Sequence, residues 1–263
     1  MHKDSIGYIV ALVVALCLVC SAVVSIAAIG LRDLQQANVA LERNANLLAA
    51  AGLLDFDQPD AKERVAELLD NVETRVVDLR NGELAPQIDP EAYDQLAARN
   101  NPAQSGQLAN TADIAGLGAR EHYGKVYVVK TPQGELDALV LPVRGYGLWS
   151  TMYGFIALER DLNTVRGFGF YQQGETPGLG GEVDNPKWKA LWPGKKLFDM
   201  DGVPKLSIVK NPNPAGDAYS RQVDALSGAT LTSRGVDNLI KFWMGELGYG
   251  GFLAKLRSKE IAL

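Results

Sequence analysis

The chain is poor in the residues from which most catalytic and metal sites are built. Its 263 residues include only two histidines, His2 and His122, and only two cysteines, Cys17 and Cys20. After residue 20 the chain has one histidine and no cysteine, which are too few for a cysteine–histidine zinc site and leave a single candidate histidine for a serine–histidine–aspartate triad. We predict no metal site and no catalytic residue, and the scarcity favours a function whose chemistry belongs to a cofactor.

Positive charge is also sparse. The chain has 26 lysines and arginines against 31 aspartates and glutamates, which gives a formal net charge of −5. It has no long basic run and no basic stripe interleaved with aromatic residues, so we expect no nucleic-acid partner. The length and the ordinary apolar content allow one large or two small packed domains after any membrane segment.

Charged side chains are absent from residues 6–31. A helix needs roughly 20 apolar residues to cross a bilayer, so this run is long enough. The alternative is a cleaved signal peptide, for which residues 25–27 offer a small-residue cleavage site, but its apolar region is usually about 7–15 residues. We therefore predict one transmembrane helix. Lys3 and the amino terminus, against Arg32 beyond the helix, favour a cytoplasmic N-terminus.

Cys17 and Cys20 form a C-x-x-C pair inside this apolar segment. Buried cysteines commonly behave as small hydrophobic residues, whereas a redox or metal role needs a polar, accessible site. Packing is the favoured interpretation of the pair, and a redox or metal role is the alternative.

Apolar periodicity and turn residues divide the rest of the chain into short helices and strands. We predict helices at 34–51 and 61–70, a short helix that opens at 185–186, and an amphipathic helix after residue 233. We predict strands at 75–79, 125–130, 136–143, 152–158, 164–171 and 206–209, of which the second and third form a hairpin, and a surface excursion at 100–118. Consecutive strands indicate an α+β fold, with a mixed, mainly antiparallel sheet and flanking helices. No G-x-G-x-x-G follows a strand, which disfavours a Rossmann-type fold.

Residues 224–233, Asp-Ala-Leu-Ser-Gly-Ala-Thr-Leu-Thr-Ser, form a small-residue turn just before the amphipathic helix. The apolar face of that helix consists of Val236, Leu239, Ile240, Trp243, Met244 and Leu247. Thr232 or Ser233 is a suitable N-cap. Thr230 would then lie at the positive end of the helix dipole, where its hydroxyl can receive or hold a phosphate. From spacing alone, a capped loop without a ligand is the commoner explanation.

Four segments carry a resemblance to known proteins. Asp-x-x-Ser-Gly-Ala-Thr at 224–230 is similar to the motif of proteins that carry FMN linked through its phosphate to the final threonine. Residues 174–181, Gly-Glu-Thr-Pro-Gly-Leu-Gly-Gly, resemble the second signature of the same FMN-binding domain family, and 145–150 and 208–210 match further segments. Order, spacing and the membrane segment most resemble the C subunits of Na⁺-translocating NADH:quinone oxidoreductases.

Two alternatives remain beside this resemblance. The G subunits of Rnf-type ferredoxin:NAD oxidoreductases share the FMN-binding domain, but the longer region between the membrane helix and the first core strand favours the C subunits. The second alternative is a membrane-anchored binding or assembly module without redox activity.

The resemblance implies an FMN joined covalently to Thr230, with roles for the residues around it. The other motif residues expected at the cofactor are Ser227, Gly228 and Ala229. The second signature supplies Thr176, Leu179 and Gly180 as candidates for holding the isoalloxazine ring, and Glu175 as a further cofactor-binding candidate. Tyr146 and Trp149 either pack on the flavin or belong to the core, and Lys210 either pairs with the phosphate or is solvated. Asp224 is expected to be recognised by the attaching enzyme, or to cap the turn.

The resemblance also implies partners and a location. A separate flavin transferase, using FAD and Mg²⁺, would install the FMN, and the chain would relay electrons within a six-subunit membrane complex coupled to sodium export. The complex would lie in the inner membrane of a Gram-negative bacterium, with membrane lipid around the helix and the body in the periplasm. We divide the chain into an anchor at 1–33, a mixed helical part of the periplasmic body at 34–120 and an FMN-binding domain at 121–263.

Overall fold

The computed structural model describes residues 5–263, and the chain divides into two units, 1–42 and 43–263. The first unit contains helix α1 (Ile6–Gly30), which carries no charged side chain. With a mean hydropathy of 3.0 over its most apolar stretch, α1 is long and apolar enough to cross a membrane. It fits the predicted membrane anchor.

Local contacts define the start of this helix. The Ser5 hydroxyl oxygen accepts a hydrogen bond from the Tyr8 N–H at 3.2 Å, as an N-cap does. Cys17 and Cys20 both lie on α1 as free thiols. Lys3, on which the predicted orientation rests, lies outside the described residues.

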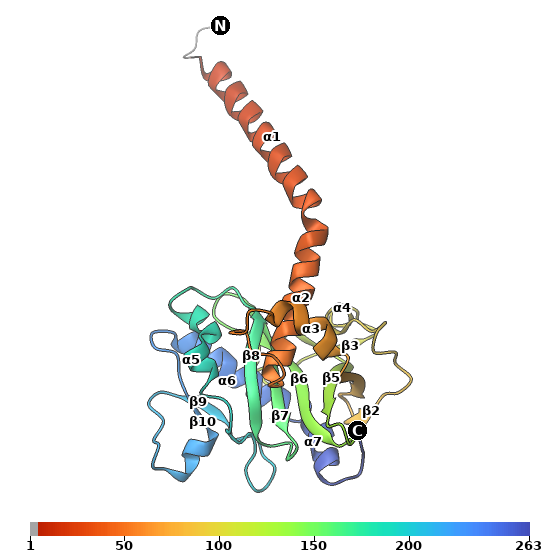
Figure 1. Cartoon of the computed structure of the whole chain (residues 1–263). Helices are drawn as coiled ribbons and strands as arrows, with labels where there is room; N and C mark the ends of the chain where they lie inside the picture. Colours follow the sequence, from red (N-terminus) through yellow and green to blue (C-terminus); the bar gives the residue numbers. More distant parts are fainter. Residues whose placement is uncertain (1–4) are drawn as a thin grey trace. The chain divides into compact units, whose positions relative to one another are not determined.

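Helices and strands alternate irregularly in the remainder of the chain, as an α+β fold requires (Figure 1). The helices are α2 (Arg32–Ala50), which begins in the first unit and continues into the second, α3 (Ala61–Leu69), α4 (Gln95–Ala98), η1 (Gly180–Asp184), α5 (Pro186–Lys189), η2 (Asp217–Arg221), α6 (Thr230–Met244) and α7 (Gly250–Arg257). The strands are β1 (Val72–Asp78), β2 (Glu83–Leu84), β3 (Ser105–Gln107), β4 (Ala119–Glu121), β5 (Tyr123–Lys130), β6 (Leu136–Tyr146), β7 (Thr151–Glu159), β8 (Val165–Gln172), β9 (Ser207–Val209) and β10 (Gln222–Asp224).

Six strands form one antiparallel sheet in the order β2-β1-β5-β6-β7-β8. The predicted hairpin is confirmed, since Tyr127 of β5 pairs with Val140 of β6 and Gly134 takes a positive φ of 84° in the turn. Two small ribbons complete the strands: β3 pairs with β4 antiparallel, and β9 pairs with β10 parallel. The expected mixed, mainly antiparallel arrangement is therefore confirmed.

The main core lies between this sheet and α6. Leu139, Leu141 and Ile156 point from the sheet into the same buried cluster as the apolar face of α6. The approach is close, because a Cβ added to Gly145 of β6 would lie only 2.9 Å from the Leu239 Cβ. α6 is thus held tightly against one face of the sheet, and the segment that precedes it is positioned with it.

The opposite face of the sheet is covered by α3 and by the part of α2 from Arg43 onward (Figure 1). A Cβ on Gly167 of β8 would lie 2.4 Å from the Ala50 carbonyl oxygen, so strand and helix touch there. Aromatic side chains occupy the middle of this face: the Phe155 ring lies 5.9 Å from Tyr127 and 5.3 Å from Tyr171. This face of the sheet is therefore lined in part by aromatic side chains.

Two predictions about elements need correction. Residues 100–118 are mostly exposed, as a surface excursion would be, but β3 pairs with β4 and both Ala115 and Leu117 are buried in the main core. The apolar face of α6 stops at Met244, since the helix ends there and Leu247 lies beyond it. Both errors concern polar or glycine-rich stretches whose structure depends on contacts distant in sequence.

The domain division at 33 and 120 stays a prediction. In the structure, β1 and β2 come before residue 120, and both belong to the sheet that β5–β8 build. The body from Arg43 onward thus shares one sheet across the proposed boundary.

Candidate functional site

Thr230 is the first residue of α6, so the helix begins earlier than the predicted start after residue 233. The predicted N-cap is wrong: Ala229 occupies that position without a side-chain cap, and Thr232 and Ser233 are buried within the first turn. Their hydroxyls bind elsewhere. Ser233 accepts a hydrogen bond from the Leu226 N–H at 3.0 Å, which closes the preceding turn.

The first turn of α6 presents open hydrogen-bond donors. Within the described residues, the N–H groups of Thr230, Leu231 and Thr232 have no hydrogen-bond acceptor; the first paired amide is that of Ser233, which donates to the Ala229 carbonyl. Thr230 is exposed, and its hydroxyl makes no hydrogen bond in the same part of the chain. Free amides at a helix N-terminus favour an anion there.

The parallel ribbon brings two predicted residues to this turn. Asp224 of β10 pairs with Val209 of β9, so Lys210, the next residue after β9, reaches the same end. The Ile208 N–H donates to the Asp237 carboxylate at 2.9 Å, which ties the ribbon to α6. The ribbon and the helix thus enclose the turn from two sides.

A cavity of about 440 Å³ opens between the ribbon and the start of α6. Its lining includes five predicted site residues, which the structure brings together: Lys210, Asp224, Ser227, Gly228 and Thr230. Ala229, the remaining motif residue, is buried beside them. The Asn211 N–H donates to the Asp224 carboxylate at 3.3 Å, so this side chain also holds the ribbon end.

Arg234 also lines this cavity, and the sequence reasoning missed it. It follows Thr230 by four residues, which places both side chains on one side of a helix. That spacing is the signal that could have found it. Arg234 and Lys210 are both exposed and make no ion pair among residues 5–263, so the cavity has two free cations beside an exposed hydroxyl.

Glu175, one of the predicted cofactor-binding residues, is buried and joins two segments of the site. Only 5% of its surface is exposed, and its carboxylate accepts hydrogen bonds from three consecutive backbone N–H groups, those of Leu148, Trp149 and Ser150, at 3.0–3.2 Å. It also accepts a hydrogen bond from the Thr232 hydroxyl at 2.6 Å. Glu175 therefore joins the 148–150 loop to the first turn of α6.

This network also sets the ionisation of Glu175. Burial alone would raise the pKa of the carboxyl, but the hydrogen bonds from Thr232 and from the three amides outweigh it and lower the pKa below its ordinary value. Glu175 is therefore held as a carboxylate, which is the form that accepts all four donors.

Glycines allow these segments to pack without side chains between them. A Cβ on Gly180 would lie 2.5 Å from the Thr232 hydroxyl oxygen, and one on Gly147 would lie 2.6 Å from a Glu175 carboxylate oxygen. A Cβ on Gly235 of α6 would lie 2.5 Å from the Tyr146 carbonyl oxygen. These contacts fix the 146–150 and 175–180 loops against the start of α6.

Exposed apolar side chains surround that start. Trp149 is 67% exposed and Tyr146 is half-exposed, so the interpretation of these two aromatics as core residues is wrong. Leu148, Leu179 and Leu231 are exposed as well, and Leu179 reaches Gly228, whose Cβ would lie 3.2 Å from its side chain. Large apolar groups gathered at one surface often mark a binding site.

Thr176 differs from its neighbours. Its side chain is exposed, and its carbonyl accepts hydrogen bonds from the N–H groups of Leu179 and Gly181. Thr176 therefore shapes the loop that presents Leu179.

The residues present fit a flat aromatic cofactor that is attached through a phosphate. The free amides and the cations Lys210 and Arg234 suit a phosphate beside Thr230. The exposed apolar residues that Glu175 and the glycines hold nearby suit an aromatic ring system.

Comparison with known proteins agrees with this geometry. The FMN-binding domain family matches residues 147–245, a range that includes Trp149, Glu175 and Thr230. The chain is 52% identical to the C subunit of the Na(+)-translocating NADH-quinone reductase of Pseudomonas aeruginosa, over 96% of this chain and 95% of that protein. It is 46% identical to the protein of the same name from Yersinia pestis, over 97% and 95%.

Solved structures show the same fold. The crystal structure of Shewanella oneidensis NqrC matches with a TM-score of 0.72 and 34% identity, over 82% of this chain and 96% of that one. The crystal structure of the C subunit from Parabacteroides distasonis matches with a TM-score of 0.64 and 28% identity, over 85% and 96%. Because the sequence identity is 46–52% over nearly the full length of both chains, the chain belongs to the family of C subunits of Na⁺-translocating NADH-quinone reductases.

Proposed function

We propose that the chain is the electron-carrying member of such a reductase and holds FMN in a phosphoester bond to Thr230. The observation that carries the proposal is the exposed Thr230 hydroxyl at the open N-terminus of α6, beside the cations Lys210 and Arg234. Family membership and the match to the FMN-binding domain support it. When bound, FMN supplies reversible electron transfer, which needs no acid–base residue from the chain.

The attachment step is a phosphoryl transfer to Thr230. Its hydroxyl oxygen forms a bond to the FMN phosphorus of FAD, the bond between the two phosphoryl groups breaks, AMP leaves, and the hydroxyl proton passes to solvent or to a base of the transferase. We assign this reaction to a separate flavin transferase that uses FAD and Mg²⁺. Lys210 and Arg234 would offset the negative charge of the phosphate, and Asp224 would be recognised by the transferase.

The surrounding loops would hold the ring. Leu179, Tyr146 and Trp149 offer exposed apolar surface, and Glu175 with Gly180 keeps their loops against α6. Because the bond is at the phosphate, it leaves the ring system electronically unchanged, and packing and exposure would tune its potential.

The membrane helix sets the proposed location. α1 would cross the inner membrane once, with the N-terminus in the cytoplasm, lipid around the helix and the body in the periplasm. There the chain would pass electrons between redox centres of the other subunits, and the complex would couple this transfer to sodium export. A covalent cofactor suits that location, because it cannot diffuse away.

Peptide mass spectrometry tests the proposal. Trypsin releases residues 222–234 as one peptide, which contains Thr230. In full-length chain made with the transferase, this peptide should carry one FMN, and Thr230→Ala should lack it. Ser227→Ala removes a neighbouring hydroxyl as the matched control and should keep the FMN. Flavin retained on the peptide in Thr230→Ala, or a flavin-free native chain, would contradict the assignment.

A further inference from the structure

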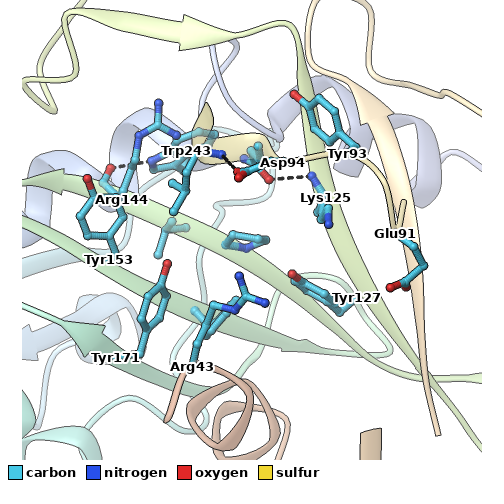
Figure 2. A pocket seen from close by; sticks show the side chains of 15 residues that line it. Arg43, Glu91, Tyr93, Asp94, Lys125, Tyr127, Arg144, Tyr153, Tyr171 and Trp243 are labelled. Carbon is cyan, nitrogen blue, oxygen red and sulfur yellow. Dashed lines mark hydrogen bonds between the residues drawn. The ribbon is translucent and has the colours of Figure 1, made fainter. Parts of the chain in front are cut away.

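A second cavity, of about 340 Å³, is lined mainly by side chains on the face of the sheet opposite α6, and Trp243 of α6 also reaches its lining (Figure 2). Its floor is aromatic: Tyr127, Tyr153, Phe155 and Tyr171 project from β5, β7 and β8 on the same side of the sheet. The Phe155 and Tyr171 rings lie 5.3 Å apart, and those of Tyr153 and Tyr171 lie 6.3 Å apart. We call this space the aromatic cavity.

The aromatic cavity is rich in hydrogen-bond donors that have no acceptor. Within residues 5–263, the hydroxyls of Tyr127, Tyr153 and Tyr171 make no hydrogen bond. Burial raises the pKa of Tyr127, and it raises that of Tyr171 to about 12, so both remain neutral donors. Figure 2 shows the Tyr171 and Tyr127 hydroxyls directed toward the space between them.

Two cations complete the lining. Arg43 reaches the cavity from α2 and Lys125 from β5, and neither forms an ion pair in the described part of the chain. Burial lowers the pKa of Lys125, and the charge of Arg43 lowers it further. The charges of Glu91, Asp94 and Asp89 oppose this shift, but none of these acids forms an ion pair with Lys125 in the described part of the chain; the Asp94 carboxylate accepts the N–H groups at the start of α4, and Glu91 is exposed.

We propose that the aromatic cavity binds a planar aromatic anion. Its rings offer stacking and edge contacts to a flat molecule, and its hydroxyls and cations donate to a carboxylate or similar acidic group. A volume of about 340 Å³ is in the range of small-molecule pockets. The site shares no lining residue with the cavity at Thr230, so the proposal does not depend on flavin attachment.

Calorimetric titration of the full chain in nanodiscs tests this site, with empty nanodiscs subtracted. The probe is 2-naphthoate, which joins a flat ring system to one carboxylate. We expect saturable binding of one molecule per chain. 2-Naphthalenemethanol lacks the charge and cyclohexanecarboxylate lacks the aromatic ring, and each should bind about tenfold more weakly.

Matched variants identify the site. Lys125→Met and Arg43→Met should each weaken 2-naphthoate about tenfold and leave 2-naphthalenemethanol nearly unchanged. Tyr171→Leu should weaken both probes. Lys130→Met, on the same strand but paired with Glu73 outside the cavity, should change neither.

Two further results decide the outcome. Lys210→Met alters only the cavity at Thr230. If this variant binds 2-naphthoate with unchanged affinity, the binding belongs to the aromatic cavity. Unsaturable binding, or full affinity in folded Lys125→Met and Arg43→Met, would overturn the proposal. Thermal unfolding of each variant establishes folding, and Tyr127→Phe, which removes only a hydroxyl, provides a milder variant with an expected weakening of about threefold.

Discussion

The two faces of the central sheet are built on different principles. On the α6 face, glycines let backbone and side chains approach closely, as at Gly145 against Leu239 and Gly235 against the Tyr146 carbonyl. On the opposite face, Gly167 allows an equally close approach to the Ala50 carbonyl, but large aromatic side chains surround a cavity of about 340 Å³. Close contact leaves little room for movement, whereas a cavity leaves space beside the rings that line it.

This difference places the two candidate sites. The cavity at Thr230 lies at the end of the tightly packed α6, which would give the proposed FMN fixed neighbours. The aromatic cavity lies on the looser face, where a ligand could enter and leave. Substitutions on each face test whether the two faces act independently.

We expect the largest loss of stability at the buried Arg144–Glu121 ion pair, which lies close to Trp243 of α6. The Arg144 guanidinium forms two hydrogen bonds with the Glu121 carboxylate at 2.6 and 2.7 Å, and both residues are almost completely buried. The Arg144 carbonyl accepts a hydrogen bond from the Trp243 indole of α6 at 2.7 Å. Arg144→Met should lower the free energy of unfolding by about 3–5 kcal/mol, because it leaves a buried carboxylate unpaired.

Denaturant unfolding of the full chain in detergent measures this loss. Glu121→Leu combined with Arg144→Met removes both charges and should recover much of the stability. A double variant no more stable than Arg144→Met would show that packing, and not the unpaired charge, sets the loss.

The next effect concerns the Glu175 network on the α6 face. Glu175→Gln keeps one acceptor oxygen for four donors, so we expect a loss of about 2–3 kcal/mol and a lower FMN content. Thr232→Val removes a single donor and is the matched control, with an expected loss of about 1 kcal/mol. Equal losses in both variants would contradict a shared network.

The same network predicts a pH dependence. The pKa of Glu175 is lowered in the folded chain, so its contribution is complete above the ordinary value of 4.5 and is lost as the pH falls through the lower folded value. Stability of the native chain should therefore fall more steeply below pH 4.5 than that of Glu175→Gln. Parallel curves of unfolding free energy against pH for the two chains would contradict this.

One substitution can be made on both faces. Gly235→Ala places a Cβ 2.5 Å from the Tyr146 carbonyl oxygen, and Gly167→Ala places one 2.4 Å from that of Ala50. Each should cost about 1–3 kcal/mol through overpacking, although alanine favours the helix at position 235. Only Gly235→Ala should lower the FMN content, because it displaces the loop beside α6. Flavin loss in Gly167→Ala would mean that the faces are not independent.

The sequence predicted the elements whose signal is local. The hairpin of β5 and β6 and the existence of α6 follow from alternation, turn residues and helical period, although α6 begins at Thr230 and not after residue 233. The predicted N-cap of α6 was wrong because the hydroxyls of Thr232 and Ser233, both good N-cap residues, form hydrogen bonds with Glu175 and with the Leu226 N–H instead. Those partners are set by tertiary packing, which local pattern does not encode.

The sequence predicted most residues of the site but not the hydrogen bonds between them. The resemblance picked out Glu175, yet the structure places its carboxylate on three backbone amides of a loop about 26 residues away in sequence. No motif shows such a bond, because backbone amides carry no sequence identity. Arg234 was missed for a simpler reason: its relation to Thr230 becomes visible only when the helix is known to begin at Thr230.

We expect the smallest change when one cation is removed from either face, measured as the rate of FMN attachment. Arg234→Gln removes one cation from the cavity at Thr230, and we expect FMN attachment by the transferase to slow about two- to fivefold at low salt. Because Arg234 is exposed, high salt should screen its charge and bring the variant close to the native rate. Lys62→Gln makes the same charge change on exposed α3, over the opposite face, and should leave the rate unchanged. A fall in rate of equal size for both variants would assign the effect to net charge, whereas a fall confined to Arg234→Gln and lost at high salt would place the electrostatic attraction at the first turn of α6.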